Sequence, residues 1–166
     1  MDYQHFMEKA LDQAKMALSA GEFPVGCVMV YEDTIIVDGY RKGTTKGSVN
    51  EIDHAEILTL RRLIDLEKNK DKNKITLFCT LEPCLMCFGA ILLSGIGEIV
   101  YAYEDVMGGG TGCNLSKLNP LYKNRKVSIV SNILRQESLE LFKVYFANPV
   151  NTYWKGSLLA KHMLNQ

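Results

Sequence analysis

Two cysteines at a short spacing are the first feature of this sequence that could perform chemistry. Cys84 and Cys87 follow Pro83, where an apolar strand-like run gives way to a helical pattern. Thiols three residues apart lie on one face of a first helical turn. The free backbone N–H groups and the positive dipole end at that turn lower thiol pKa values and favour the ionised form. A thiolate pair of this kind suits either a metal ion or a reversible dithiol couple.

His54 and Glu56 form a second candidate pair, which the sequence also places at the start of a helix. Taken alone, an imidazole and a carboxylate two residues apart often occur by chance at an exposed helix start. In two neighbouring βα units, however, both helix starts come to one end of the sheet, where α/β proteins place their sites. The sequence therefore predicts that His54 lies beside the cysteine pair.

The number of available ligands indicates which kind of metal site this would be. A structural zinc site takes four protein ligands, whereas a catalytic site takes three and leaves one position open. His54, Cys84 and Cys87 supply three. The other cysteines are poor candidates for a fourth ligand, because two lie within predicted strands and one lies in a glycine-rich loop: Cys27, Cys79 and Cys113. The prediction is a catalytic Zn²⁺ that makes a water molecule acidic, with Glu56 as a proton shuttle and not a ligand.

Two other classes of protein remain open for these residues. One is a zinc protein without activity, such as a silent partner subunit, although the presence of Glu56 argues against it. The other is a dithiol oxidoreductase, in which Cys84 and Cys87 form a reversible disulfide and no metal is bound. Metal content distinguishes the dithiol oxidoreductase from the two zinc proteins, and enzymatic activity distinguishes the catalytic zinc protein from the silent one.

The segments around these residues predict an α/β fold. Helical spacing of apolar residues predicts helices, and β-rich or continuously apolar runs predict strands. Helices are expected over 2–19, 54–66, 84–93, 134–146 and 151–164, and strands over 25–31, 34–39, 75–80, 98–103 and 127–130. A polar loop is expected over 41–53, a polar linker over 67–74 and a long glycine-bearing loop over 104–125. This order predicts a three-layer α/β/α architecture with a mixed five-stranded central sheet, in one domain over residues 1–166.

The overall composition limits the class of protein. A chain of 166 residues that is 47% hydrophobic can fill the core of one domain. Nineteen basic and nineteen acidic residues cancel, so the total charge does not indicate a polyanionic partner, although a local patch would escape this test. The sequence lacks the pattern of a secretory signal, and no apolar stretch is long enough to span a bilayer. We expect a cytoplasmic protein without a membrane partner.

Together the two motifs resemble the signature of the cytidine and deoxycytidylate deaminase superfamily, in which His-x-Glu and Pro-Cys-x-x-Cys form the zinc site. The similarity covers residues 5–146 and is strongest to bacterial tRNA-specific adenosine deaminases. It includes segments 23–26, 54–57, 80–87, 89–90 and 94–96. The resemblance implies a cytidine-deaminase-like fold and a homodimer. It also implies Zn²⁺ bound by His54, Cys84 and Cys87, with Glu56 as the catalytic acid/base.

The substrate is less sharply defined than the chemistry. The resemblance favours adenosine in tRNA, which would become inosine. The alternative is a free base, nucleoside or nucleotide such as guanine, cytosine, cytidine or deoxycytidylate. Arg41 departs from the pattern, since the relatives carry an asparagine there that helps hold the nucleoside. From about residue 148 the helical C-terminal segment also diverges from the basic end that is usual in the family.

Four residues are predicted to contact the substrate. Val25 and Gly26 are expected to wall the base pocket, because a glycine at a strand start allows close backbone approach. Arg41 could bind a phosphate or carboxylate with two hydrogen bonds, or it could be an exposed arginine at a hairpin end. Asp105 matches an acidic position that faces the substrate in the family.

Two other segments are open to more than one interpretation. The basic run 123–126 could contact an RNA backbone, although a solvated loop is the favoured interpretation. Tyr153 and Trp154 could stack on a base, although packing of the last helix against the core is favoured. The sequence assigns no role to the 104–125 loop or to the C-terminal helix.

Overall fold

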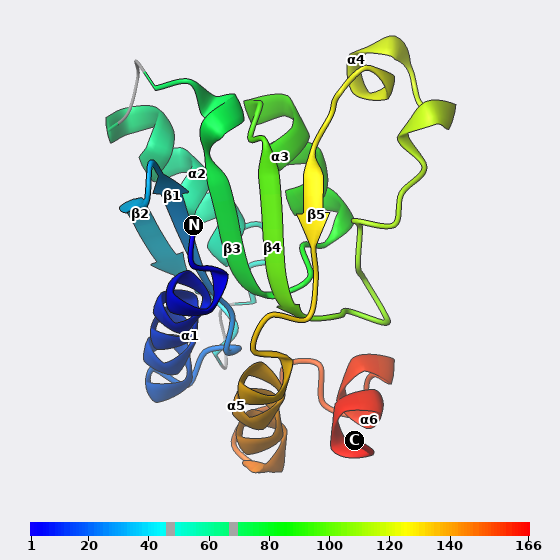
Figure 1. The fold of residues 1–166 in the computed structure, drawn as a ribbon. Helices are drawn as coiled ribbons and strands as arrows, with labels where there is room; N and C mark the ends of the chain where they lie inside the picture. Colours follow the sequence, from blue (N-terminus) through cyan, green and yellow to red (C-terminus); the bar gives the residue numbers. More distant parts are fainter. Residues whose placement is uncertain (46–48, 67–69) are drawn as a thin grey trace.

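A computed structural model shows a chain folded around one five-stranded sheet (Figure 1). The structure describes residues 1–45, 49–66 and 70–166. The strand order is β2-β1-β3-β4-β5, with bounds β1 Gly26–Tyr31, β2 Thr34–Tyr40, β3 Thr76–Leu81, β4 Glu98–Tyr103 and β5 Ser128–Val130. β1 is antiparallel to both β2 and β3, whereas β3, β4 and β5 are parallel to one another. The predicted mixed five-stranded sheet is confirmed.

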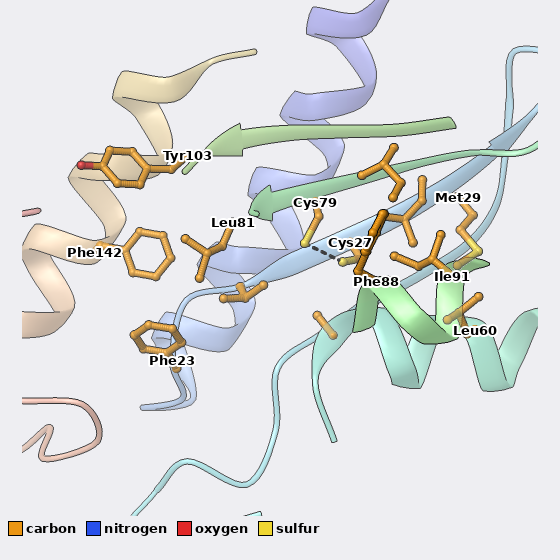
Figure 2. Packing of buried hydrophobic residues seen from close by; sticks show 14 of the residues in the cluster. Phe23, Cys27, Met29, Leu60, Cys79, Leu81, Phe88, Ile91, Tyr103 and Phe142 are labelled. Carbon is orange, nitrogen blue, oxygen red and sulfur yellow. Dashed lines mark hydrogen bonds between the residues drawn. The ribbon is translucent and has the colours of Figure 1, made fainter. Parts of the chain in front are cut away.

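Helices cover both faces of this sheet, which gives the predicted three layers (Figure 1). Their bounds are α1 Tyr3–Ser19, α2 Ala55–Leu66, α3 Leu85–Ser94 and α5 Arg135–Ala147. Because successive strand side chains point to opposite faces, β1 and β3 contribute to two cores. Val28 and Phe78 pack with residues of α1 on one face. Met29 and Leu77 belong to the other cluster, which includes residues of α2 and α3 (Figure 2).

Local signals explain the elements that lead to the predicted site. Glu32 and Asp33 both have positive φ, 49° and 56°, as a two-residue hairpin turn between β1 and β2 requires. Helix α3 begins directly after Cys84, which occupies the N-cap position. It ends at Gly95, whose φ of 78° is the left-handed conformation that commonly stops a helix. The predicted α3 therefore presents its first turn, and with it Cys87, at the carboxyl end of β3.

The segments expected to be irregular contain short helical turns. The 104–125 loop includes a 3₁₀ turn, η2 Leu115–Lys117, and a short helix, α4 Pro120–Lys123. Part of the predicted linker, residues 67–69, lies outside the described residues, and the remainder contains a 3₁₀ turn, η1 Lys72–Lys74. Of the predicted 41–53 loop, residues 46–48 also lie outside the described part of the chain.

The C-terminal helix is shorter than the sequence predicts. It was expected over 151–164, but α6 spans only Leu158–Leu164. The prediction is wrong for the first half because Trp154 and Gly156 have φ values of 55° and 73°, which a right-handed helix cannot contain. Ser157 then starts α6, since its side chain accepts a hydrogen bond from the backbone N–H of Ala160. Residues 153–156 form turns instead of a helix.

Across the described ranges, no helix combines the length and the apolar character that a bilayer crossing requires.

Candidate active site

His54, Cys84 and Cys87 come together at the carboxyl end of β3. The Sγ atoms of both cysteines lie 3.5 Å from Nδ1 of His54. All three donor atoms lie within 4.8 Å of one another. With Zn–S near 2.3 Å and Zn–N near 2.0 Å, tetrahedral geometry places sulfur and nitrogen about 3.5 Å apart. The donor set therefore has the atom types and spacing that fit a zinc ion.

Electrostatics within this donor set favour a thiolate. Hydrogen bonds from Cys87 and His54 lower the pKa of Cys84 to about 4, although burial acts in the opposite direction. The pKa of Cys87 is raised, because its thiol donates to Cys84 and is itself buried. Burial lowers the pKa of His54, but the hydrogen bond to Cys84 and the charge of Glu56 outweigh this and raise it. A set of side chains that already stabilises negative charge on a cysteine sulfur is suited to binding a divalent cation.

Glu56 lies in the first turn of α2, two residues after His54, and its side chain is only 3% exposed. Burial raises the pKa of its carboxyl group, while the nearby His54 acts in the opposite direction. A buried carboxyl group beside a metal donor set can exchange protons with bound reactants without competition from bulk water.

Cys27 and Cys79 lie next to the Glu56 carboxylate. They face each other across the β1–β3 pair, and the thiol of Cys27 donates to Sγ of Cys79 at 3.1 Å (Figure 2). Burial raises the pKa of both thiols, so they are neutral. The ligand atoms of this pair group with Glu56, separately from the donor set of His54, Cys84 and Cys87. The sequence placed both cysteines in strands but did not predict that they meet beside Glu56.

Glu82 is a residue of the cavity lining that the sequence analysis did not select. Its carboxylate accepts hydrogen bonds from the backbone N–H of Asp105 at 3.1 Å and of Thr111 at 3.2 Å, and from the Thr111 hydroxyl. Gly109 lies so close to the Glu82 carboxylate that a Cβ atom there would collide with it. The beginning of the 104–125 loop is thus attached to the segment that carries Cys84 and Cys87. The sequence did contain a signal for this contact: an acidic residue, Glu82, lies just before the two cysteines, and a run of glycines follows at 108–110.

The same loop also contacts the backbone at the start of α3. Gly110 donates its N–H to the carbonyl of Pro83 at 2.9 Å, and Gly109 forms an isolated bridge with Cys84. A Cβ atom on Gly110 would lie 2.7 Å from Cα of Leu85. The glycines therefore permit a close approach of the loop to the turn that carries Cys84 and Cys87, which explains their position.

A cavity of about 200 Å³ opens directly beside the donor set. Its lining combines aromatic and aliphatic side chains with polar groups: Phe23, Val25, Arg41, Glu51, His54, Glu56, Leu81, Glu82, Cys84, Asp105, Met107, Gly108, Tyr153, Trp154 and Leu159. Val25, Arg41 and Asp105, which the sequence analysis selected, are among them. Gly26 is not, because the side its missing Cβ would occupy faces the α1 backbone at Ala10 and Ala14. The close approach that this glycine allows is to a helix.

Arg41 is buried at the edge of the cavity, with an exposed fraction of 2%. The interpretation as an exposed hairpin-end arginine is therefore wrong. Its guanidinium donates to the carbonyl of Lys42 at 2.6 Å and to the Tyr153 hydroxyl at 3.4 Å, and lies 3.6 Å from the Glu51 carboxylate. These contacts hold a positive charge next to the cavity.

Tyr153 and Trp154 differ in their surroundings. The ring of Tyr153 lies 5.4 Å from that of Phe23, and its hydroxyl donates to Glu51 at 2.7 Å. The expected packing against the core thus holds for Tyr153. Both side chains line the cavity, but Trp154 is 42% exposed.

Asp105 is held in the loop by two backbone donors. Its Oδ1 accepts from the N–H groups of Met107 and Gly108, both at 2.9 Å. Burial raises the pKa of Asp105, although these hydrogen bonds act in the opposite direction. The basic run 123–126 is not part of the cavity lining; its Arg125 and Lys126 border a separate surface hollow with Asn73.

Comparisons with known proteins agree with this geometry. Residues 1–103 match the family described as the cytidine and deoxycytidylate deaminase zinc-binding region. The chain is 35% identical over 142 residues to a tRNA-specific adenosine deaminase of Rickettsia typhi, covering 84% of this chain and 95% of the relative. It is 31% identical over 153 residues to tRNA-specific adenosine deaminase 2 of Xenopus tropicalis, covering 87% and 89%.

Solved structures give the same result for the fold. One structure from a study of tRNA:A34 deaminases matches with a TM-score of 0.71 at 29% identity, covering 82% of this chain and 98% of that one. A guanine deaminase from Nitrosomonas europaea matches with a TM-score of 0.68 at 20% identity, covering 87% and 85%, and shows the fold alone.

The fold and the site define a hydrolase that acts on a carbon–nitrogen bond, namely a deaminase. The chain belongs to the cytidine and deoxycytidylate deaminase family, whose zinc-binding region it contains.

Proposed function

We propose that this chain is a zinc-dependent deaminase that converts adenosine in tRNA to inosine. The observation that carries the chemistry is the donor set of His54, Cys84 and Cys87 beside the buried carboxyl group of Glu56 at one cavity. The substrate rests on the similarity to relatives named tRNA-specific adenosine deaminases over most of the chain.

In this proposal His54, Cys84 and Cys87 hold the zinc ion. When bound, zinc supplies a Lewis acid that makes water nucleophilic near neutral pH. Glu56 takes a proton from the attacking water and delivers protons to the ring nitrogen and to the departing amine, which leaves as ammonia. Its burial keeps the carboxyl group close to the reacting atoms and away from solvent.

The cavity is suited to one base. Its volume of about 200 Å³ is small beside the roughly 300–1,000 Å³ of drug-sized ligand sites. A deaminase acting on a polynucleotide brings a single unstacked base into such a pocket. We assign Val25, Arg41 and Asp105 to substrate contact on this basis, with Gly26 setting the position of β1 against α1.

A homodimer in the cytoplasm completes the proposal. The dimer rests on the family resemblance of the sequence motifs, and the location rests on the role in tRNA modification proposed here. Sedimentation of the purified chain at several concentrations tests the oligomeric state, and a monomer throughout would remove the dimer from the proposal.

A second candidate function is the deamination of a free nucleotide. Buried Arg41 favours it, because a guanidinium beside the cavity can bind a phosphate with two hydrogen bonds. The acidic side chains that share the lining disfavour a phosphate at this place: Glu51, Glu56, Glu82 and Asp105. We therefore keep adenosine in tRNA as the main proposal.

Ammonia release from zinc-loaded protein tests both candidates. The protein is incubated with transcribed tRNA and, in parallel, with free bases, nucleosides and nucleotides. We expect turnover of tRNA, and turnover of small molecules alone would contradict the proposal. Glu56→Ala should retain zinc and lose about 10²- to 10⁴-fold in rate. Glu137→Ala, an exposed change on α5, is the matched control and should keep both zinc and activity.

A further inference from the structure

Trp154 is an exposed aromatic side chain of the cavity lining that the proposed chemistry does not use. It is the single tryptophan of the chain, it lines the cavity, and 42% of it is exposed. Tryptophan side chains bury much of their large apolar surface when they serve only packing. The exposed part of this indole is therefore available to a ligand that reaches the cavity mouth.

The backbone holds Trp154 in a conformation that bulky residues rarely adopt. Its φ of 55° lies in the left-handed region, which is strained for such a residue. The turn is closed by hydrogen bonds from Lys155 to the carbonyl of Thr152 at 3.2 Å and from Ser157 to the carbonyl of Trp154 at 3.1 Å. Strain of this kind persists where the surrounding structure fixes it, and it clusters at functional sites.

The residue before Trp154 fastens this turn to the rest of the site. The Tyr153 ring packs on Phe23, and its hydroxyl joins Glu51 and the Arg41 guanidinium. The rings of Tyr153 and Trp154 lie 5.5 Å apart in an edge-on arrangement. Because the tyrosine is anchored on two sides, the indole is presented at a fixed place beside the cavity.

A nucleic acid strand would place a base at this position. When one base enters the cavity, its neighbours in the strand remain outside, with unstacked faces next to the mouth. Proteins bind such bases by stacking them on aromatic side chains, an interaction that accepts every base. Lys155 is exposed and next in sequence, and supplies a positive charge for the adjoining phosphate.

We propose that Trp154 is the stacking platform for the nucleotide immediately next to the target adenosine in an RNA strand. This inference rests on the proposed function of deaminating a base in RNA. It gives the turns over 153–156 a role in substrate binding, separate from the metal ligands and from Glu56.

Because the chain has one tryptophan, its fluorescence reports this site directly. The zinc-loaded Glu56→Ala protein is titrated with a short RNA stem-loop that carries one adenosine in its loop. Two further stem-loops carry an abasic residue on the 5′ or the 3′ side of that adenosine. The intact stem-loop should quench the fluorescence. One of the abasic RNAs should lose this quenching and bind about 5- to 150-fold more weakly, the effect of removing one stacked base.

A double-mutant cycle separates stacking from a general loss of structure. In Trp154→Ala, read by an RNA-borne label, the same abasic change should no longer weaken binding. Trp154→Phe should keep part of the penalty. Val150→Ala, an exposed change in the same segment that does not touch the cavity lining, should keep all of it.

Three results would overturn the inference: absence of quenching by the intact RNA, equal affinity for intact and abasic RNAs, or an undiminished penalty in Trp154→Ala. Quenching by free adenosine that matches the RNA would also overturn it, since Trp154 would then contact the target base. Failure of the active protein to release ammonia from this RNA and from tRNA would instead contradict the proposed function, whereas stacking is judged from binding alone.

Discussion

The hydroxyl of Tyr153 donates a hydrogen bond of 2.7 Å to Oε2 of Glu51, joining two residues 102 positions apart in the sequence. The Arg41 guanidinium lies 3.4 Å from the same hydroxyl and 5.6 Å from the tyrosine ring. Through these contacts the C-terminal segment becomes one wall of the cavity. A region that diverges from the family pattern therefore takes part in shaping the site.

Removing this hydroxyl should weaken substrate binding more than the chemical step. In Tyr153→Phe the ring can stay against Phe23, but Arg41 and Glu51 lose a partner. We expect KM to rise about fivefold, equivalent to about 1 kcal/mol for one hydrogen bond, with a smaller change in kcat. Steady-state kinetics measure both. Tyr122→Phe on α4, outside the cavity lining, is the control, and equal effects of the two variants would contradict the assignment.

Metal binding should depend on His54 and not on histidines elsewhere. His54→Ala leaves two thiols, so we expect a large loss of zinc measured by elemental analysis and a loss of ammonia release. His5→Ala, an exposed change on α1, should retain both. A strong chelator should inactivate the wild-type protein, and added zinc should restore it. Full zinc content in His54→Ala would exclude this residue as a ligand.

Glu82 should be required to keep the 104–111 segment attached to the cysteine motif. In Glu82→Gln the amide cannot accept as strongly from Asp105 and Thr111, so we expect a loss of about 1–3 kcal/mol in the free energy of unfolding. Faster hydrogen exchange should appear first in this segment. Glu137→Gln should change neither quantity. Unchanged exchange over 104–111 in Glu82→Gln would show that the carboxylate does not hold the loop.

Gly26 should be needed for stability, because β1 approaches α1 too closely there for a side chain. A Cβ atom would collide with the backbone of Ala10 and Ala14. Gly26→Ala should therefore cost about 1–3 kcal/mol in the free energy of unfolding, measured by urea denaturation. Gly89→Ala in α3, where a Cβ atom meets nothing within 4 Å, should be neutral or should stabilise by up to about 1 kcal/mol. Similar losses in both variants would contradict this explanation.

The pair of Glu104 and Arg135 should make stability depend on acid pH. Hydrogen bonds from Arg135 lower the pKa of Glu104, although partial burial acts in the opposite direction, and His162 lies 3.7 Å away. Because the folded-state pKa is below the unfolded value, the pair stabilises the fold above the ordinary glutamate pKa of about 4.3. This contribution is lost as the pH falls through the folded-state pKa.

Glu104→Gln should therefore be less stable than the wild type by about 1 kcal/mol at neutral pH, a value suited to a partly exposed pair. The difference should shrink below the ordinary glutamate pKa of about 4.3 and close in stronger acid. Urea denaturation across this pH range measures it, with the exposed Glu8→Gln as control. A difference that stays constant with pH would show that the charge of Glu104 is not responsible.

Much of the site was predictable because its signals are local. Residues 54–56 and 84–87 each sit at the start of a helix, and the helix and strand patterns around them specify parallel βα units whose ends meet. The three-layer architecture with a mixed five-stranded sheet followed from the same alternation of apolar residues. The spacing of apolar residues predicts helices and strands because the backbone geometry of each element repeats within a few residues.

The remaining features depend on contacts between distant residues, which only the tertiary structure decided. Glu82 meets Thr111, Cys27 meets Cys79, and Tyr153 meets Arg41 across 29, 52 and 112 positions. The left-handed turn at Trp154 replaced a predicted helix because Tyr153 is anchored to Phe23 and Glu51, and such anchoring overrides a helical pattern. The sequence by itself therefore determined the candidate metal donors and the layers that carry them, while the burial of Arg41 and the wall formed by 151–159 came from packing between segments.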